Sequence, residues 1–146
     1  MTDHQNRLEM IVNKLRELQF RITPQRLAIL KAFLTNDTHP TVEEIFQQVK
    51  ISFPTTSLAT AYKTVHLLKE IGEILEIDFS DNSNRYDGKR PYPHPHIICR
   101  QCGAIMDPEM DSLEKMIREM EKKSGYQISS HQINFFGLCP TCRNEK

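Results

Sequence analysis

The sequence lacks an excess of either charge, a long apolar segment and an export signal. Its 146 residues include 19 Lys and Arg and 19 Asp and Glu, so the formal net charge is zero. Overall charge therefore gives no evidence for a nucleic-acid partner, and any DNA-binding face must be local. No apolar run approaches the roughly 18 residues of a membrane span, and the polar N-terminus does not resemble a secretory signal. We expect a globular, cytoplasmic protein with no membrane partner.

Cysteine is scarce but regularly spaced. The four Cys form two pairs, Cys99-x-x-Cys102 and Cys139-x-x-Cys142. In a reducing cytoplasm such pairs are expected to bind a metal in preference to forming disulfides. Each turn directs two thiolates at one ion, and two turns complete a closed tetrahedron, which favours structural Zn²⁺. A thioredoxin-like redox role is the alternative, but it would leave the second pair unexplained.

The first half of the chain carries four helical patterns. The first has apolar residues at helical spacing from Leu8 to Leu18. The other three have start signals: Thr23-Pro24, the capping box Thr41-x-x-Glu44, and Ser57. We expect the fourth helix to end at Gly72, with Leu58 on its inward face.

A short ribbon is expected after these helices. Residues 75–79 alternate between apolar and acidic side chains, the polar residues 80–83 favour a turn, and residues 84–87 can return beside the first strand. Several helices followed by a two-stranded ribbon are typical of a winged helix-turn-helix, in which the last helix enters the major groove. We therefore assign residues 1–87 to an N-terminal DNA-binding domain.

Polar and basic side chains on this domain are candidate DNA contacts. Thr60, Tyr62 and Lys63 on the outward face of the fourth helix could reach bases and phosphates. Ser57 is a further candidate contact, and the candidate backbone clamps are Arg21, Arg26, Arg85, Lys89 and Arg90. The alternative is that these are ordinary solvated charges on a helical bundle.

A stiff connector separates the two halves. Residues 88–95 contain Pro91, Pro93 and Pro95, and proline fixes φ and removes a backbone donor. Residues 96–146 then read as strands over 96–100 and 104–107, a helix capped by Asp111-x-x-Glu114, and a last strand over 127–136. The fold class is thus α+β, a winged helix followed by a small α/β domain. So small a second domain needs a metal, a second subunit, or both.

Histidine and aspartate supply a second set of metal ligands. His94 and His96 share a face of an extended strand, and Asp107 lies on the next strand. His39 and Asp87 belong to the other domain, and spacing alone does not place them with the first three. Imidazole and carboxylate ligands without thiolate suit Fe²⁺ or Mn²⁺.

Several motifs in a fixed order resemble one family over nearly the whole chain. They are Arg21-x-Thr23-Pro24-Gln25-Arg26, His39-Pro40-Thr41, Ser57-Leu58-Ala59-Thr60-Ala61-Tyr62, Asn84-Arg85-Tyr86-Asp87, His94-x-His96-Ile97-Ile98-Cys99-x-x-Cys102-Gly103 and Cys139-x-x-Cys142. The sequence resembles the ferric uptake regulator family of bacterial metal-dependent transcription factors. This resemblance implies a homodimer that binds double-stranded operator DNA.

Within that family the sequence is most similar to the peroxide-sensing branch. The resemblance implies a regulatory Fe²⁺ or Mn²⁺ site made of His39, Asp87, His94, His96 and Asp107. Iron-sensing members commonly have Glu where this chain has Asp87 and Asp107. The resemblance also implies that peroxide oxidises His39 or His94 to 2-oxo-histidine, which releases the metal and the operator.

Three other functions are open to the sequence. One is a regulator of the same family that senses iron or zinc availability and needs no ligand oxidation. Another is a zinc-stabilised interaction module that binds no DNA. The third is a small metalloenzyme that uses His94, His96 and Asp107 as a facial triad. The sequence implies no deep substrate pocket and places no extra general base nearby. We therefore expect a repressor, not an enzyme, with peroxide as its only small-molecule signal.

Overall fold

The computed structural model describes residues 3–79 and 84–145. The chain folds into two compact units, the first ending at Tyr92 and the second beginning at Pro93. Among the described residues, no helix combines the length and apolar character required to cross a membrane.

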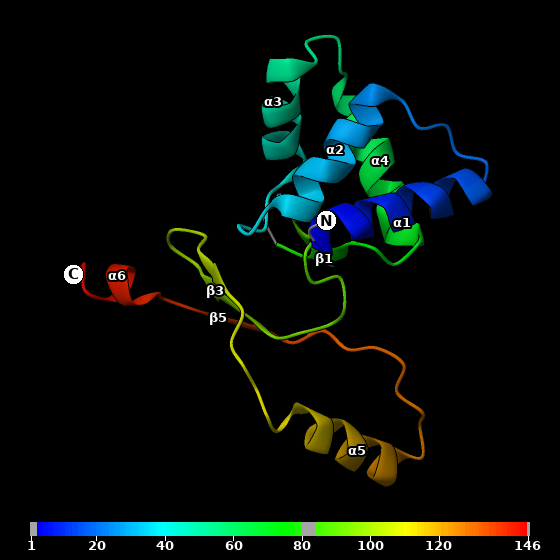
Figure 1. The fold of residues 1–146 in the computed structure, drawn as a ribbon. Coiled ribbons are helices and arrows are strands. Elements are labelled where there is room, and N and C mark those ends of the chain that lie inside the picture. The colour runs from blue at the N-terminus through cyan, green and yellow to red at the C-terminus, as the bar shows by residue number, and fades with distance from the viewer. Residues whose placement is uncertain (1–2, 80–83, 146) are drawn as a thin grey trace. The chain divides into compact units, whose positions relative to one another are not determined.

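Four helices build most of the first unit (Figure 1). They are α1 (Asp3–Glu17), α2 (Pro24–Thr35), α3 (Val42–Ser52) and α4 (Leu58–Glu70). The side chains of Thr23, Thr41 and Ser57 accept hydrogen bonds from the backbone N–H three residues later, which caps α2, α3 and α4 as predicted. The sequence therefore specifies where these three helices begin.

The apolar faces of the four helices form one core. Ile11 and Leu15 of α1, Phe33 of α2, Ile45 of α3 and Leu68 of α4 are fully buried in it. The predicted inward position of Leu58 is wrong, because this first residue of α4 is 38% exposed. Helical periodicity predicts a face only where a neighbouring element covers it, and the first turn of α4 extends past the core.

The predicted ribbon follows α4. Strands β1 (Leu75–Ile77) and β2 (Arg85–Asp87) are antiparallel, with Leu75 opposite Asp87 and Ile77 opposite Arg85. The turn expected at residues 80–83 lies outside the described residues. Four helices and a ribbon in this order form the predicted winged helix-turn-helix, with α3 and α4 as its two-helix motif.

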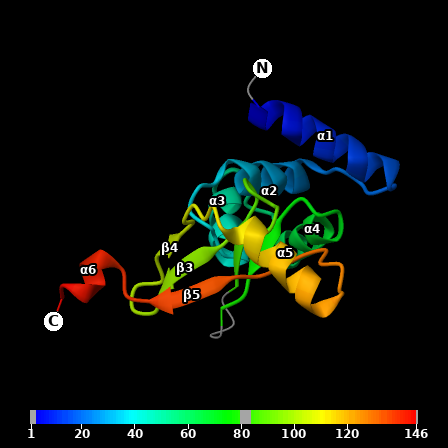
Figure 2. The ribbon, with the colours of Figure 1, turned by 90° about the horizontal axis from the view of Figure 1, so that it is seen from below.

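The second unit contains a small sheet, in which β3 lies between two other strands (Figure 2). Strand β3 (His96–Cys99) pairs antiparallel with β4 (Ile105–Met106) and parallel with β5 (Asn134–Gly137). Helix α5 (Leu113–Ser124) lies between β4 and β5 in sequence, and the short helix α6 (Pro140–Arg143) follows β5.

The predicted boundaries in this unit are partly wrong: β3 ends one residue early, at Cys99, β4 covers only Ile105–Met106 of the predicted residues 104–107, and two other elements differ as well. Helix α5 starts at Leu113 behind Ser112, which makes no side-chain capping bond, so Asp111 is not its cap. The last strand covers only Asn134–Gly137 instead of residues 127–136. Its length is set by its partner, because β3 offers only the four positions from His96 to Cys99 for pairing.

Helix α5 has an apolar face that its own unit leaves uncovered. None of its residues is buried, although Met116 and Met120 recur at helical spacing. Figure 1 shows α5 standing apart from β3 and β5. Phe135 and Phe136 of β5 are also about half exposed, at 51% and 46%. The second unit thus presents large apolar side chains that it does not bury.

Candidate metal centres and nucleic-acid interface

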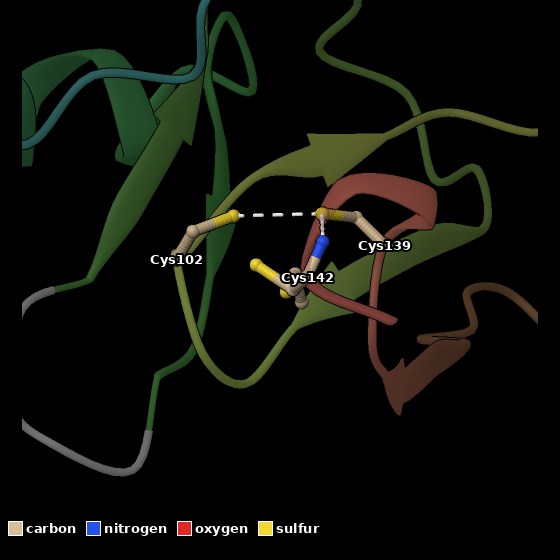
Figure 3. A group of neighbouring side chains, drawn as sticks. Cys102, Cys139 and Cys142 are labelled. Carbon is tan, nitrogen blue, oxygen red and sulfur yellow. Dashed lines mark hydrogen bonds between the residues drawn. The ribbon is translucent and has the colours of Figure 1, made fainter. Parts of the chain in front are cut away.

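The four cysteines meet at one end of the small sheet. Cys99 ends β3, Cys102 follows in a tight turn, and Cys139 caps α6, which contains Cys142. All four sulfur atoms lie within 4.8 Å of one another. Figure 3 shows the sulfur atoms of Cys102, Cys139 and Cys142 converging, with 3.8 Å between those of Cys102 and Cys139.

These distances fit a tetrahedral metal. Four sulfurs about 2.3 Å from a zinc ion would lie about 3.8 Å from one another. All four cysteines are free thiols. Backbone N–H groups of Cys102 and Cys139 lower the pKa of the Cys99 thiol to about 6, whereas burial and the neighbouring thiols raise the pKa of Cys142 to about 12. A divalent cation would supply the charge that lets all four ionise together.

In the first unit, His39 lies beside Asp87. The Nε2 atom of His39 is 3.3 Å from Oδ2 of Asp87. The other carboxylate oxygen, Oδ1, accepts hydrogen bonds from the backbone N–H of Lys89 at 3.0 Å and of Arg90 at 2.8 Å. These two bonds orient the Asp87 carboxylate so that Oδ2 faces the imidazole.

The loop before α3 is held against β2. The backbone carbonyl of Pro40 accepts a hydrogen bond from the N–H of Tyr86 at 3.0 Å, and Nη1 of Arg85 donates to the carbonyl of His39 at 3.3 Å. His39 has a φ of 52°, a left-handed conformation that costs a non-glycine residue about 1 to 3 kcal/mol. The surrounding fold therefore maintains a strained backbone in order to place this imidazole beside Asp87.

In the second unit, two histidines share one carboxylate. The Nε2 atoms of His94 and His96 lie 3.5 Å from Oδ2 and Oδ1 of Asp107, respectively. The two imidazole rings have centroids 4.4 Å apart and are tilted by 52°. The predicted sharing of one face by these histidines is therefore observed, and the β3–β4 pairing brings Asp107 to them.

Within each unit, the imidazole nitrogen and carboxylate oxygen atoms are spaced as two ligands of one metal ion would be. The distances of 3.3 to 3.5 Å are longer than a normal N–H···O hydrogen bond. Nitrogen and oxygen ligands about 2.1 Å from one ion lie about 3 to 3.4 Å from each other. The first unit thus carries an imidazole and a carboxylate, and the second carries two imidazoles and a carboxylate, side chains of the chemistry that Fe²⁺ and Mn²⁺ accept.

The candidate DNA contacts cluster at two places in the first unit. Ser57, Thr60, Tyr62 and Lys63 belong to the start of α4, while Arg21 and Arg26 flank the start of α2. Ser57 and Thr60 are engaged with each other: the Ser57 hydroxyl accepts from the Thr60 N–H at 3.1 Å, and their hydroxyl oxygens are 2.9 Å apart. Arg26 Nη1 donates to the Arg21 carbonyl at 2.6 Å.

A surface hollow of about 560 Å³ is lined by three of these six residues. Its lining includes Arg26, Tyr62, Lys63 and the aromatic rings of Phe20 and Tyr86. The cationic groups around aromatic rings could contact both phosphates and base edges. Burial raises the pKa of the Tyr86 hydroxyl from 10.0 to about 12.

The structure adds two contacts that sequence analysis missed. The Tyr62 hydroxyl donates a hydrogen bond to Oε1 of Glu43 in the first turn of α3. The Arg7 guanidinium of α1 donates to the carbonyl of Gly88, next to Asp87, and to the Glu73 carbonyl at 2.9 Å. Both contacts join residues far apart in the chain, so no local spacing could have predicted them.

Comparison with known proteins identifies the family. Residues 17–136 match the sequence profile of the Ferric uptake regulator family. The chain belongs to this family. The peroxide-responsive repressor PerR of Staphylococcus saprophyticus is 36% identical over 144 residues, which cover 97% of this chain and 95% of that protein.

Solved structures share the fold of this ferric uptake regulator family member. The Helicobacter pylori ferric uptake regulator superposes with a TM-score of 0.87 at 23% identity, covering 99% of this chain and 97% of its own. The Campylobacter jejuni peroxide stress regulator gives a TM-score of 0.71 at 30% identity, covering 92% and 98%. These matches confirm the α+β fold class with its winged helix. The protein is accordingly a metal-responsive transcriptional regulator of this family, not an enzyme.

Proposed function

We propose that this protein is a dimeric, metal-dependent repressor that senses hydrogen peroxide through oxidation of a ligand histidine. One observation carries the proposal: each unit presents part of an imidazole and carboxylate ligand set that contains no thiolate. His39 and Asp87 would provide two ligands, and His94, His96 and Asp107 the other three. In this scheme residues 1–87 bind DNA, residues 88–95 form a hinge, and residues 96–146 form the dimerisation domain.

In the proposed regulatory step, metal binding selects one orientation of the first unit relative to the second. If one ion takes ligands from both, it selects the arrangement in which the two winged helices of a dimer fit two operator half-sites. Because metal and DNA then favour the same arrangement, each tightens the binding of the other by the same factor. Ligation also offsets the negative charge of Asp87 and Asp107 near the DNA.

Peroxide would end repression by damaging the ligands. Bound Fe²⁺ would supply the redox chemistry that inserts one peroxide oxygen into an imidazole C–H bond of His39 or His94, giving 2-oxo-histidine and water. The altered ring is a poorer ligand, so the metal ion that both units bind would dissociate and the operator would be released. Mn²⁺ would support DNA binding without this oxidation.

The other predicted sites support this role structurally. We assign Zn²⁺ to Cys99, Cys102, Cys139 and Cys142, where a closed thiolate tetrahedron would stabilise the fold of the small second unit. A second copy of the chain would cover the exposed apolar side chains of α5 and β5. Arg21, Arg26, Ser57, Thr60, Tyr62 and Lys63 would contact the operator. The relatives named peroxide-responsive repressor favour peroxide as the signal.

The decisive test is mass spectrometry of tryptic peptides. Protein purified without oxygen is loaded with Fe²⁺, treated with about one equivalent of peroxide and digested. We expect a gain of one oxygen on the peptide spanning residues 32–50, which bears His39, or on the peptide spanning 90–100, where fragmentation should place it on His94 and not on His96 or Cys99. Loss of operator binding in a gel shift should accompany the oxidation.

Two controls make this test specific. The Mn²⁺-loaded protein should show neither change, and the peptide spanning residues 64–69, which bears the exposed His66, should stay unmodified. Unmodified histidines together with intact Fe²⁺-dependent operator binding would instead identify a regulator of iron availability.

A further inference from the structure

Tyr62 on α4 is tied to Glu43 on α3. The phenol hydroxyl donates its hydrogen to Oε1 of Glu43, and both residues are exposed. Tyr62 as a whole is 46% exposed although its hydroxyl has a partner. The same hydrogen bond raises the pKa of Tyr62 above the ordinary value of 10.0. A side chain at the start of the recognition helix is thus held by the neighbouring helix of the helix-turn-helix.

This bond restricts what Tyr62 can offer to DNA. A tyrosine hydroxyl has one hydrogen to donate, and otherwise its oxygen accepts. Once the hydrogen is given to Glu43, the hydroxyl oxygen can only accept. The Glu43 carboxylate is likewise an acceptor. The pair therefore presents oxygen acceptors and no donor.

The major groove distinguishes bases by donors and acceptors. Adenine N6 and cytosine N4 present amino donors there, whereas guanine O6 and N7 and thymine O4 are acceptors. A pair that offers only acceptors can hydrogen-bond to the amino groups of adenine and cytosine. It cannot hydrogen-bond to the acceptor atoms of guanine and thymine. The carboxylate also disfavours a phosphate contact at this point, because both groups are negatively charged.

We infer that Glu43 is a specificity-determining residue, which fixes Tyr62 as an acceptor for an adenine N6 or cytosine N4 amino group in the operator. This inference rests on the proposed DNA-binding function of α4. Lys63, the next residue along α4, supplies a cation for phosphate, so α4 carries separate groups for positioning and for base recognition.

The test measures base preference in the full-length, Mn²⁺-loaded protein. An operator is first selected from random duplexes with the wild-type protein. Each adenine is then replaced by 2-aminopurine and each cytosine by 2-pyrimidinone, which lack the major-groove amino group. Affinities are measured for the wild type and for Tyr62→Phe, Glu43→Ala, Glu43→Gln and Glu44→Ala. Glu44→Ala is the matched control, because it removes the same charge from the same helical turn without touching Tyr62.

We expect at least one position where the replacement weakens binding by the wild type and by Glu44→Ala roughly tenfold. At that position the same base replacement should weaken binding by Tyr62→Phe and by Glu43→Ala less than about twofold. Glu43→Gln keeps an acceptor oxygen for the Tyr62 hydroxyl, so it should retain most of the wild-type preference for the natural base over its replacement. Circular dichroism confirms that each variant is folded.

Two results would overturn the inference in distinguishable ways. If Glu43→Ala or Tyr62→Phe keeps the full wild-type discrimination at every position, Glu43 does not set specificity, while the proposed function stands. If the Mn²⁺-loaded wild type selects no duplex at all, the proposed function fails and this inference fails with it.

Discussion

Gly88 lies directly against the backbone of Phe33: a Cβ atom at residue 88 would stand 2.5 Å from the Phe33 carbonyl oxygen and 2.9 Å from its carbonyl carbon. Neither of those backbone atoms can move aside without distorting α2. The chain therefore passes from Asp87 into the connector through a position that has room only for glycine.

Gly88→Ala should consequently displace the connector and, with it, the Asp87 carboxylate. We expect the free energy of unfolding to fall by about 1 to 3 kcal/mol, and Mn²⁺-dependent operator binding to require several-fold more metal. Urea unfolding and a Mn²⁺ titration followed by fluorescence anisotropy measure the two effects. Gly137→Ala is the control, since nothing lies within 4 Å of a Cβ added there; equal effects of the two substitutions would argue against the steric explanation.

Removing the His39 imidazole should uncouple metal from DNA binding. We choose His39→Asn, because Asn tolerates the left-handed backbone of this residue. The expected result is a loss of at least about tenfold in Mn²⁺-dependent operator affinity, with an unchanged circular dichroism spectrum. His131→Asn, which alters a histidine outside both ligand groups, should behave as wild type. Full metal-dependent binding by His39→Asn would exclude His39 from the regulatory site.

The cysteine cluster should hold one zinc ion per chain. Cys102→Ser removes one of the four converging thiols, so we expect it to lose the zinc and to leave the second unit unfolded. The first unit has its own core and should keep its helices. Atomic absorption and thermal unfolding measure both outcomes; a full zinc complement in Cys102→Ser would show that this thiol is not a ligand.

Burial of Tyr86 should make stability fall at alkaline pH. The pKa of Tyr86 in the folded protein is about 12, above the ordinary value of 10.0. The contribution of this difference to the free energy of unfolding is therefore complete below pH 10 and disappears as the pH rises toward 12. Between pH 8 and pH 11 the free energy of unfolding of the wild type should fall by about 1.4 kcal/mol more than that of Tyr86→Phe, because one pKa unit corresponds to about 1.4 kcal/mol. Urea midpoints at pH 8 and pH 11 test this difference. Tyr126→Phe, at a position 77% exposed, should follow the wild type.

The exposed apolar face of the second unit should be a dimer interface. Phe135→Glu places a charge among these apolar side chains, and we expect it to convert the dimer to a monomer and to weaken operator binding more than tenfold. Ile51→Glu is the control, because Ile51 is an 83% exposed apolar residue in the first unit. Sedimentation velocity measures the oligomeric state; a dimeric Phe135→Glu protein would place the interface elsewhere.

Local sequence signals determined much of this protein. Thr23, Thr41 and Ser57 specified the starts of three helices, because a capping hydroxyl acts on N–H groups within the next turn. The Cys-x-x-Cys pairs predicted that four thiols converge, because each pair is confined to one turn, and the structure brings the four sulfur atoms within 4.8 Å of one another. Alternation on an extended strand specified that His94 and His96 share a face.

Tertiary structure alone decided the rest. Spacing along the chain does not place His39 beside Asp87, which only the family resemblance implied, because that contact depends on hydrogen bonds between the loop before α3 and β2. The length of β5 depends on the four residues of β3 that pair with it. Glu43 meets Tyr62 only because α3 and α4 pack together. Local preferences act over a few residues, whereas these contacts arise between distant segments that are brought together by burial of a common core.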